Sequence, residues 1–190
     1  MNNHFRNLAR PATVVVLSCV LATLAPARGH ADELKDGRTA LTAGRYDEAL
    51  QLFEKASAQG YAEGRAGVGQ VWLRRRNYEK ALEAFEIAQK MDANLAMSYW
   101  GIGEVARRNE EYAGALPSFK RAVELDRKFP EAQLALGDVL TQLKRYDEAV
   151  EALNPGLNWG TKWKPRFLVQ LGFVELARDA TSGVVIREGF

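Results

Sequence analysis

The sequence predicts an all-α protein in which helical hairpins repeat along a solenoid. The segment Arg45–Ala56, RYDEALQLFEKA, recurs in similar form over 77–88, 111–122 and 145–156. A period of about 32 to 34 residues is typical of stacked helical repeats. Within each unit, the apolar residues return every three or four residues, which is the spacing of one helix face. The chain is therefore expected to be an array rather than a globule with a single central core.

Tyrosine, glycine and alanine positions fix the register of the units. Tyr46, Tyr78, Tyr112 and Tyr146 follow one another at intervals of 32, 34 and 34 residues. Two antiparallel helices approach within about 8 to 10 Å only where the side chains at the crossing are short. The small residues therefore predict where the helices cross. They are Gly37, Gly69, Gly103 and Gly137 in the first helices, and Ala49, Ala81, Ala115 and Ala149 in the second.

Residues 1–31 differ from the rest of the chain and resemble a secretory signal peptide. Arg6 and Arg10 precede the uncharged segment 12–25, and small residues follow as far as Ala31. As a helix, this apolar segment reaches about 21 Å, short of the roughly 30 Å hydrocarbon core of a bilayer. A basic head, a short apolar middle and a small-residue exit together predict a cleaved leader. Cleavage is expected after Ala31, with Ala27 as the alternative.

Two other interpretations of this segment stay open. An uncleaved membrane anchor would need a longer apolar run. A lipid anchor through Cys19 would fit the loose likeness of 16–19 to a bacterial lipobox, but it would leave 20–24 apolar at the mature terminus. We expect an exported protein without stable membrane insertion, which in a Gram-negative cell lies in the periplasm.

Removing the leader leaves few residues for catalysis. Cys19 is the only cysteine, and His4 and His30 are the only histidines. Three of the 26 basic residues would also leave, so 23 would face 24 acidic ones, a net charge of −1 that does not favour nucleic acid. Without His and Cys, the usual nucleophilic and zinc-binding arrangements are absent. We expect no enzyme activity, no metal site and no cofactor.

The remaining chain divides into repeats and a different ending. Pro130 suits a first helical position, and Pro117 lies near a helix start, where its missing N–H is expected to cost little. The sequence 154–156, Asn-Pro-Gly, is expected to end the last second helix near Asn154. The predicted segments are an array over 32–179 with repeats 32–61, 62–95, 96–129 and 130–157, an amphipathic capping helix over 165–178, and a tail over 180–190.

A basic aromatic cluster near the capping helix admits two interpretations. It comprises Trp159, Lys162, Trp163, Lys164, Arg166 and Phe167. The tryptophans can pack over the broken helix and close the array, which is the interpretation that we prefer. Alternatively, the cluster can form a binding surface for a glycan or a membrane face.

The units resemble the tetratricopeptide repeat family, which has a 34-residue helix-turn-helix pattern. The family's Leu-Gly pair is matched at 68–69, 102–103, 136–137 and 171–172. Its Ala-x3-Phe pair is matched at 49–53, 81–85 and 115–119, and conservatively at 149–153. The chain departs from the pattern at the tryptophan position, where only Tyr99 is aromatic. The resemblance implies a right-handed superhelical solenoid of about four repeats plus a capping helix.

The resemblance also implies a protein-binding scaffold, with a partner protein or peptide in a concave groove lined by the first helices. It does not include the lysine and asparagine arrangement that clamps a C-terminal carboxylate in some members, which disfavours a chaperone-tail binder. Envelope assembly is one role of exported members, and self-association as a structural protein is an alternative. The groove positions transferred from the family are Arg38, Gln70, Arg74, Trp100, Glu104, Arg108, Leu134 and Asp138.

Trp100 is the most informative of these residues. Tyr99 fills the family's packing position beside it, which directs Trp100 to the groove and makes it a candidate for a binding hot spot. The competing interpretation is that Trp100 packs on the neighbouring helix. Trp72, by contrast, occupies an internal position and is expected in the core.

Overall fold

The protein is described here by a computed structural model covering residues 28–182. The predicted signal peptide lies almost wholly outside these residues, as does the predicted tail beyond Ser182. The described part contains nine α-helices and one 3₁₀ helix. These are α1 (Arg28–Thr42), α2 (Tyr46–Ala58), α3 (Ala62–Arg74), α4 (Tyr78–Met91), α5 (Ala96–Arg108), α6 (Tyr112–Leu125), α7 (Pro130–Gln142), α8 (Tyr146–Leu153), η1 (Asn154–Asn158) and α9 (Gly160–Ser182).

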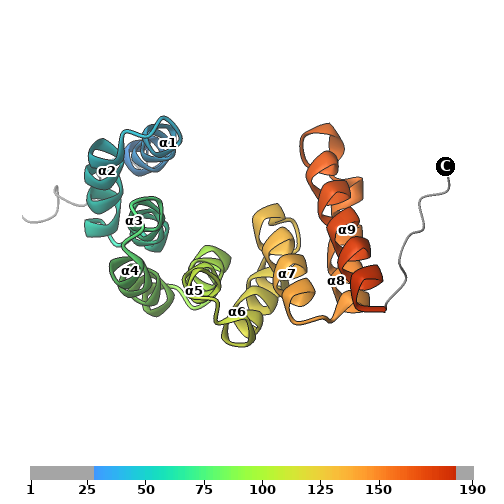
Figure 1. Ribbon diagram of the computed structural model, residues 1–190. Helices are drawn as coiled ribbons and strands as arrows, with labels where there is room; N and C mark the ends of the chain where they lie inside the picture. Colours follow the sequence, from blue (N-terminus) through green and yellow to red (C-terminus); the bar gives the residue numbers. More distant parts are fainter. Residues whose placement is uncertain (1–27, 183–190) are drawn as a thin grey trace, which may run out of the picture.

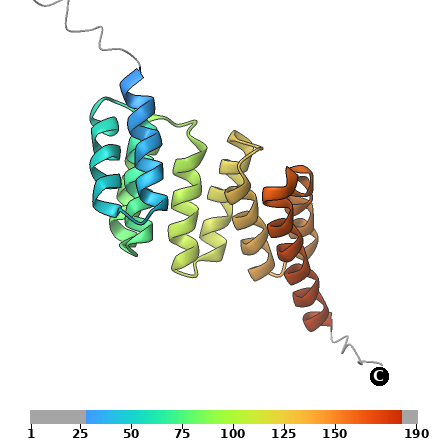
Figure 2. The ribbon, with the colours of Figure 1, turned by 90° about the horizontal axis from the view of Figure 1, so that it is seen from above.

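The helices stack in chain order along a curve, so the predicted solenoid of helical hairpins is confirmed (Figure 1). Each of α1, α3, α5 and α7 pairs with the even-numbered helix after it, and each hairpin then packs on the next helix. The odd-numbered helices also contact one another directly, from α1 to α9. As Figure 1 shows, α3 and α5 lie inside the curve while α4 and α6 lie outside it. The first helices therefore form the concave wall, and the view from above shows them side by side (Figure 2).

Each hairpin is held by one large side chain of its second helix, seated against glycine. Phe53, Phe85 and Phe119 are almost fully buried. A Cβ added at Gly69 would lie 2.9 Å from the Phe85 ring, and one added at Gly101 would lie 2.3 Å from it. The ring of each second helix therefore fills the space that glycine leaves on the first helices. The same pairing recurs between Gly37, Gly67 and Phe53, between Gly103 and Phe119, and between Gly137 and Leu153.

The turn inside each hairpin has the same backbone geometry in all four repeats. Gly44 has a φ of 75°, and the equivalent residues Arg76, Glu110 and Lys144 have φ of 58°, 62° and 60°. This left-handed conformation ends a helix and costs a non-glycine residue about 1 kcal/mol. Only the first repeat uses glycine here, so the other turns are maintained by the packing of the helices on either side.

Polar residues occupy the position where the family has tryptophan, and the structure shows how they are accommodated. Glu33 is 9% exposed, forms an ion pair with Lys55 and accepts a hydrogen bond from Gln59 at 3.1 Å. Gln133 is 4% exposed and donates to the backbone oxygen of Arg127 at 3.2 Å, but its own side-chain oxygen has no hydrogen-bond partner among residues 28–182. The departures from the family pattern therefore replace apolar packing with local hydrogen bonds.

The prediction that Pro117 costs little is wrong. It is the sixth residue of α6, beyond the first turn. The four N–H groups that lack an intrahelical partner lie before this position, so the proline removes one backbone hydrogen bond within α6.

The Asn-Pro-Gly sequence ends α8 at Leu153, as predicted near Asn154, and η1 continues the chain. Gly156 of η1 is buried against the ring of Phe167, from which an added Cβ would be 2.3 Å away. The break in the helix therefore makes room for the first buried residue of α9.

The capping helix is longer than the predicted 165–178, because α9 spans Gly160–Ser182 and includes Pro165 and the first residues assigned to the tail. Its buried residues are Phe167 and Val174. By the repeat pattern of the sequence, Leu168 and Leu176 belong to the register of a fifth first helix, but they are 51% and 59% exposed. Within residues 28–182, no second helix follows α9.

We predict opposite effects of alanine at two helical glycines. Gly101→Ala places a methyl group 2.3 Å from the nearest ring atom of Phe85, which is a steric clash. It is expected to lower the free energy of unfolding by about 1 to 3 kcal/mol. Gly114→Ala is the matched control, because Gly114 is exposed in α6 and the nearest atom to an added Cβ is 4.0 Å away. It is expected to raise stability by about 0.5 to 1 kcal/mol. Urea unfolding followed by far-ultraviolet circular dichroism measures both. Equal stability of Gly101→Ala and the wild type would contradict the packing described above.

Candidate functional site

The candidate site is the groove along the concave wall of the array. It has a volume of about 1130 Å³ and extends from α1 to α9. Its walls come mainly from the odd-numbered helices, with Phe129 at the start of α7 and Arg76 at the turn after α3 also contributing. The groove therefore runs across all the repeats rather than lying within one of them.

Helical spacing explains why these side chains face the groove. Residues four apart lie on the same side of a helix, and each first helix contributes such a pair. Gln70 and Arg74 do so in α3, and Glu104 and Arg108 do so in α5. Because the repeats share one register, equivalent positions stack along the wall from one helix to the next.

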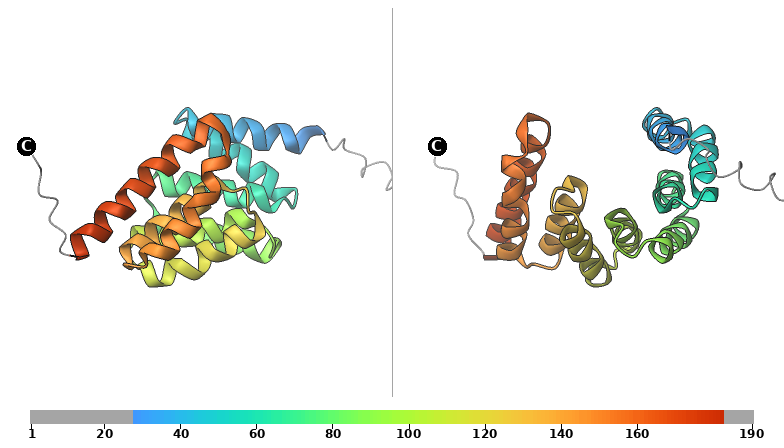
Figure 3. Two further views of the ribbon diagram at one scale, coloured as in Figure 1. Left: turned by 90° about the vertical axis from the view of Figure 1, so that its right-hand side faces the viewer. Right: turned by 180° about the vertical axis from the view of Figure 1, so that it is seen from behind.

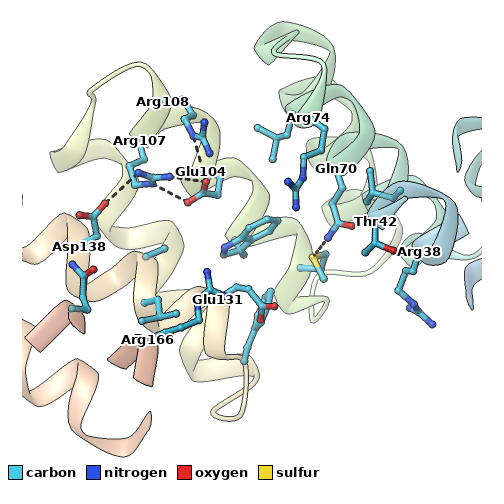
Figure 4. Close-up of a pocket in the computed structure, with 18 of the residues that line it drawn as sticks. Arg38, Thr42, Gln70, Arg74, Glu104, Arg107, Arg108, Glu131, Asp138 and Arg166 are labelled. Atoms are coloured by element: carbon cyan, nitrogen blue, oxygen red, sulfur yellow. Dashed lines mark hydrogen bonds and ion pairs between the residues drawn. The ribbon is translucent and has the colours of Figure 1, made fainter. Parts of the chain in front are cut away.

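All eight residues proposed for the groove from the sequence line it in the structure. Figure 4 shows six of them by name, directed toward the space between the helices. The sequence did not identify several further lining residues, notably Arg76, Met97, Arg107, Phe129, Glu131 and Arg166.

An ion-pair network joins α5 to α7 at the middle of the groove (Figure 4). The Nε and Nη2 atoms of Arg107 each donate to Glu104 at 2.9 Å, and Nη1 donates to Asp138 at 3.2 Å. Glu104 is only 7% exposed, and the Nε atom of Arg108 lies 3.7 Å from its Oε2, the oxygen that also accepts from Nη2 of Arg107. The hydrogen bonds to Glu104 raise the pKa of Arg107 above its ordinary value, against the opposing effect of burial. This network fixes the two carboxylates and leaves them little capacity for a further cation.

Trp100 lines the groove and also packs on a neighbouring ring. Its environment therefore has a feature of both hypotheses, the groove-facing one and the packing one. Its ring centroid lies 5.9 Å from that of Phe129, with the two planes tilted by 49°. It is half-buried against the core that contains Phe119. Leu134 is half-buried beside the same groove. These residues give the groove an apolar section beside the charged network.

The N-terminal half of the groove is positively charged. Arg38 and Arg74 are exposed there, together with Arg76 at the turn. Within residues 28–182, none of these three forms an ion pair. Gln70 lies between them and donates to the sulfur of Met97 at 2.7 Å. Three guanidinium groups are therefore available to a ligand at this end.

The charge of the whole groove is also positive, because six arginines and three carboxylates line it. Lysine is absent from its described lining. The basic residues are Arg38, Arg74, Arg76, Arg107, Arg108 and Arg166, and the acidic ones are Glu104, Glu131 and Asp138. This excess of +3 contrasts with the −1 calculated for the chain after residue 31.

The aromatic cluster at the end of the array packs on the core, as the preferred interpretation predicts. Trp159 contacts the buried ring of Phe167 edge to face, with centroids 5.5 Å apart. Trp163 also lies against this core, while Lys162 and Arg166 lie 5.5 Å and 5.1 Å from its ring centroid. Trp72 is half-buried between the first two cores, as expected, with Lys80 over its ring at 4.5 Å.

Two structural features are absent from the described residues. Between Arg28 and Ser182, no three side chains among His, Cys, Asp and Glu are grouped so that they could hold a metal ion. Over the same residues, no helix combines the length and the apolar character needed to cross a membrane.

Comparison with known proteins identifies the repeats. Family models described as tetratricopeptide repeat match residues 34–96 and again 106–168. No curated protein matches the chain.

Solved structures share the fold at low sequence identity. The thermophilic tetratricopeptide repeat protein TTC0263 of Thermus thermophilus is 21% identical over 78% of this chain and 82% of its own, with a TM-score of 0.62. YrrB, described as having an unusual peptide-binding site, is 22% identical over 77% and 76%, with a TM-score of 0.56. The first repeat domain of Spaghetti (RPAP3), solved with the HSP90 peptide SRMEEVD, is 17% identical over 61% and 96%, with a TM-score of 0.55.

The central network generates a prediction about stability. Arg107→Ala leaves Glu104 buried without its main hydrogen-bond donor, so we expect the free energy of unfolding to fall by about 2 kcal/mol. Arg121→Ala is the control, because Arg121 also pairs with a glutamate three residues away, but on the exposed surface. It should leave the unfolding midpoint unchanged. Similar midpoints for the two variants would show that the network does not stabilise the array.

Proposed function

The chain belongs to the tetratricopeptide repeat family, and on this premise we propose that it is a scaffold that binds an acidic segment of a partner protein in its concave groove. The observation that carries the proposal is the cluster of arginines without ion pairs at Arg38, Arg74 and Arg76. A guanidinium group can donate two parallel hydrogen bonds to one carboxylate, which lysine cannot do. A groove that is basic only through arginine suits aspartate and glutamate side chains.

The apolar section beside the arginines adds a second requirement for the ligand. Trp100 and Phe129 form a half-buried aromatic pair, and Leu134 lies in the same groove. Aromatic side chains surrounded by arginine are frequent hot spots of binding. The proposed ligand therefore combines acidic residues, bound near α3, with an aromatic or large aliphatic residue bound near α5 and α7.

The relatives support peptide binding as the general mode. YrrB is described by its peptide-binding site, and the RPAP3 domain was solved with an HSP90 peptide whose sequence, SRMEEVD, is acidic. This chain lacks the family's lysine and asparagine clamp for a terminal carboxylate. We therefore propose that it binds the side chains of an internal acidic segment rather than a free C-terminus.

We also propose that the protein acts outside the cytoplasm, in the assembly of a complex of the cell envelope. The support is the pattern of residues 1–31, with a basic head, an uncharged middle and small residues at its end.

Peptide display on the purified protein tests the proposed ligand. We expect selected peptides to be enriched in Asp and Glu around an aromatic or large aliphatic residue. For one selected peptide, fluorescence anisotropy should show that Arg74→Glu and Arg38→Glu each weaken binding at least tenfold. Raising the salt concentration should weaken it too, because the contacts are exposed charges. Amidation of the peptide C-terminus should change the affinity less than twofold.

A matched control separates the groove from a general effect of charge. Lys90→Glu makes the same change of charge at an exposed residue of α4 that does not line the groove, and should leave the affinity unchanged. Trp100→Ala should abolish binding and also lower the thermal midpoint, because the ring packs on Phe129. Equal weakening by Lys90→Glu and Arg74→Glu, or selection of basic peptides, would refute the proposal.

The proposed export has its own test. Mass spectrometry of the protein recovered from cells expressing the full chain should find an N-terminus at Asp32, or at Arg28 if cleavage follows Ala27. Cys19→Ser should change neither this terminus nor the cell fraction. A lipid-modified Cys19, or an intact Met1, would contradict cleavage of a secretory leader.

A further inference from the structure

The outer face of α9 is the largest exposed apolar feature of the described chain, and of its residues only Val169 lines the groove. Five large hydrophobic residues are exposed in the described part of the chain, and four of them lie on this helix. These are Leu168, Val169, Phe173 and Leu176, with exposed fractions of 51%, 58%, 57% and 59%. The view of this end of the array shows α9 uncovered along its length (Figure 3).

The helix is apolar on two opposite sides. Phe167 and Val174 are fully buried against η1, α7 and α8. At about 100° per residue, Leu176 lies roughly 160° around the helix from Val174. A helix that only closed an array would have a polar outer face. The second apolar side of α9 is therefore in place to pack against another helix.

Gly172 lies at the centre of this outer face. It is exposed, and a Cβ added to it would have no atom within 4 Å. Glycine inside an exposed helix costs about 1 kcal/mol relative to alanine. In the repeats, the equivalent glycine receives a large side chain from a second helix, as Gly103 receives Phe119. At Gly172, the same close approach is available to a helix from outside the described chain.

We propose that this helix is α9 of a second copy of the protein, packed antiparallel with the two-fold axis near Gly172. The apolar face is self-complementary about that point. Leu168 and Leu176 lie four residues on either side of Gly172, so each meets the other in the opposite copy. Gly172 of one copy faces Gly172 of the other. Because glycine has no side chain, the two helix backbones can approach closely. This contact is isologous, as in most homodimers.

The charges along α9 select the antiparallel direction. Lys162, Lys164 and Arg166 lie before the apolar face. Glu175, Arg178 and Asp179 lie toward its end, where Arg178 pairs with Glu175 and with Asp147 of α8. Antiparallel packing about Gly172 places Lys164 opposite residue 180, next to Asp179, at both ends of the contact. Parallel packing would instead place the three basic residues of one copy beside the same three residues of the other, where like charges repel. Within residues 28–182, neither Lys164 nor Asp179 has an ion-pair partner.

The length and position of α9 also suit this pairing. Its 23 residues span about 35 Å, longer than the other described helices, which have 8 to 15 residues. The helix ends the described array, and Figure 1 shows no other helix beyond it. Two arrays can therefore meet end to end. Val169 of this face lines the end of the groove, but Phe173 and Leu176 do not, so substitutions at these two residues test the helix pairing separately from the proposed peptide binding.

Sedimentation velocity of the full-length gene product, purified after its natural processing, tests the proposal. Over about 1 to 100 µM, the wild type should form a dimer, because one helix pair is a small interface of moderate affinity. Phe173→Glu and Leu176→Glu should each raise the dissociation constant at least a hundredfold. The control is Met91→Glu, since Met91 is the other exposed large hydrophobic residue and lies on α4. It should leave the dimer unchanged.

A charge exchange tests the direction of the helices. Lys164→Asp and Asp179→Lys should each weaken the dimer about tenfold, and the double variant should recover most of the wild-type affinity. Circular dichroism should show unchanged helix content in every variant, which separates lost pairing from lost folding.

Three outcomes would overturn the proposal. One is a monomeric wild type at 100 µM. A monomer that becomes a dimer after removal of 183–190 would show that the chain's own tail covers the face. A dimer unaffected by Phe173→Glu would place the interface elsewhere.

Discussion

The array depends on a side chain of each second helix that fits against glycine of the first helices. Phe85 is fully buried between Gly69 of its own hairpin and Gly101 of the next, where any Cβ would overlap the ring. One contact therefore sets two distances, the spacing inside a hairpin and the spacing between hairpins. The contact with the glycine of the same hairpin recurs in all four repeats, and the contact with a glycine of the next hairpin occurs for Phe53 and Phe85. The stability of the solenoid is therefore a sum of similar neighbour contacts.

This packing also produces the groove. With the rings directed inward, the first helices approach one another closely and form the concave wall, while the second helices lie outside. The wall then presents one face of α1, α3, α5, α7 and α9. Its chemistry is set by the residues at the exposed positions of that face, which are arginines at the N-terminal end and an aromatic pair beside a closed ion-pair network toward the centre.

The end of the array also packs a large side chain against glycine, but no second helix follows α9 among the described residues. Asn-Pro-Gly stops α8, and Phe167 of α9 packs on Gly156 in place of a longer helix. Beyond this point α9 repeats the first-helix pattern, including the glycine, but no second helix follows it among the described residues. Gly172 therefore lacks the large side chain that α6 supplies to Gly103 of α5. The groove and the exposed face of α9 are thus two surfaces of the same helical repeat. The charges of the groove do not depend on that exposed apolar face.

The sequence by itself determined the repeat length, the family and the solenoid of helical hairpins, and it proposed eight residues that line the groove, whose role in binding a partner stays a prediction. It did so because neighbouring repeats interact in a fixed register, so that periodicity along the chain specifies contacts in space. The tertiary structure alone identified the role of Arg107, since its link to Asp138 depends on the distance between α5 and α7. It also decided which side of α9 is buried. Periodicity shows two apolar sides on that helix, and only the presence of α7 and α8 on one side and of no described helix on the other distinguishes them.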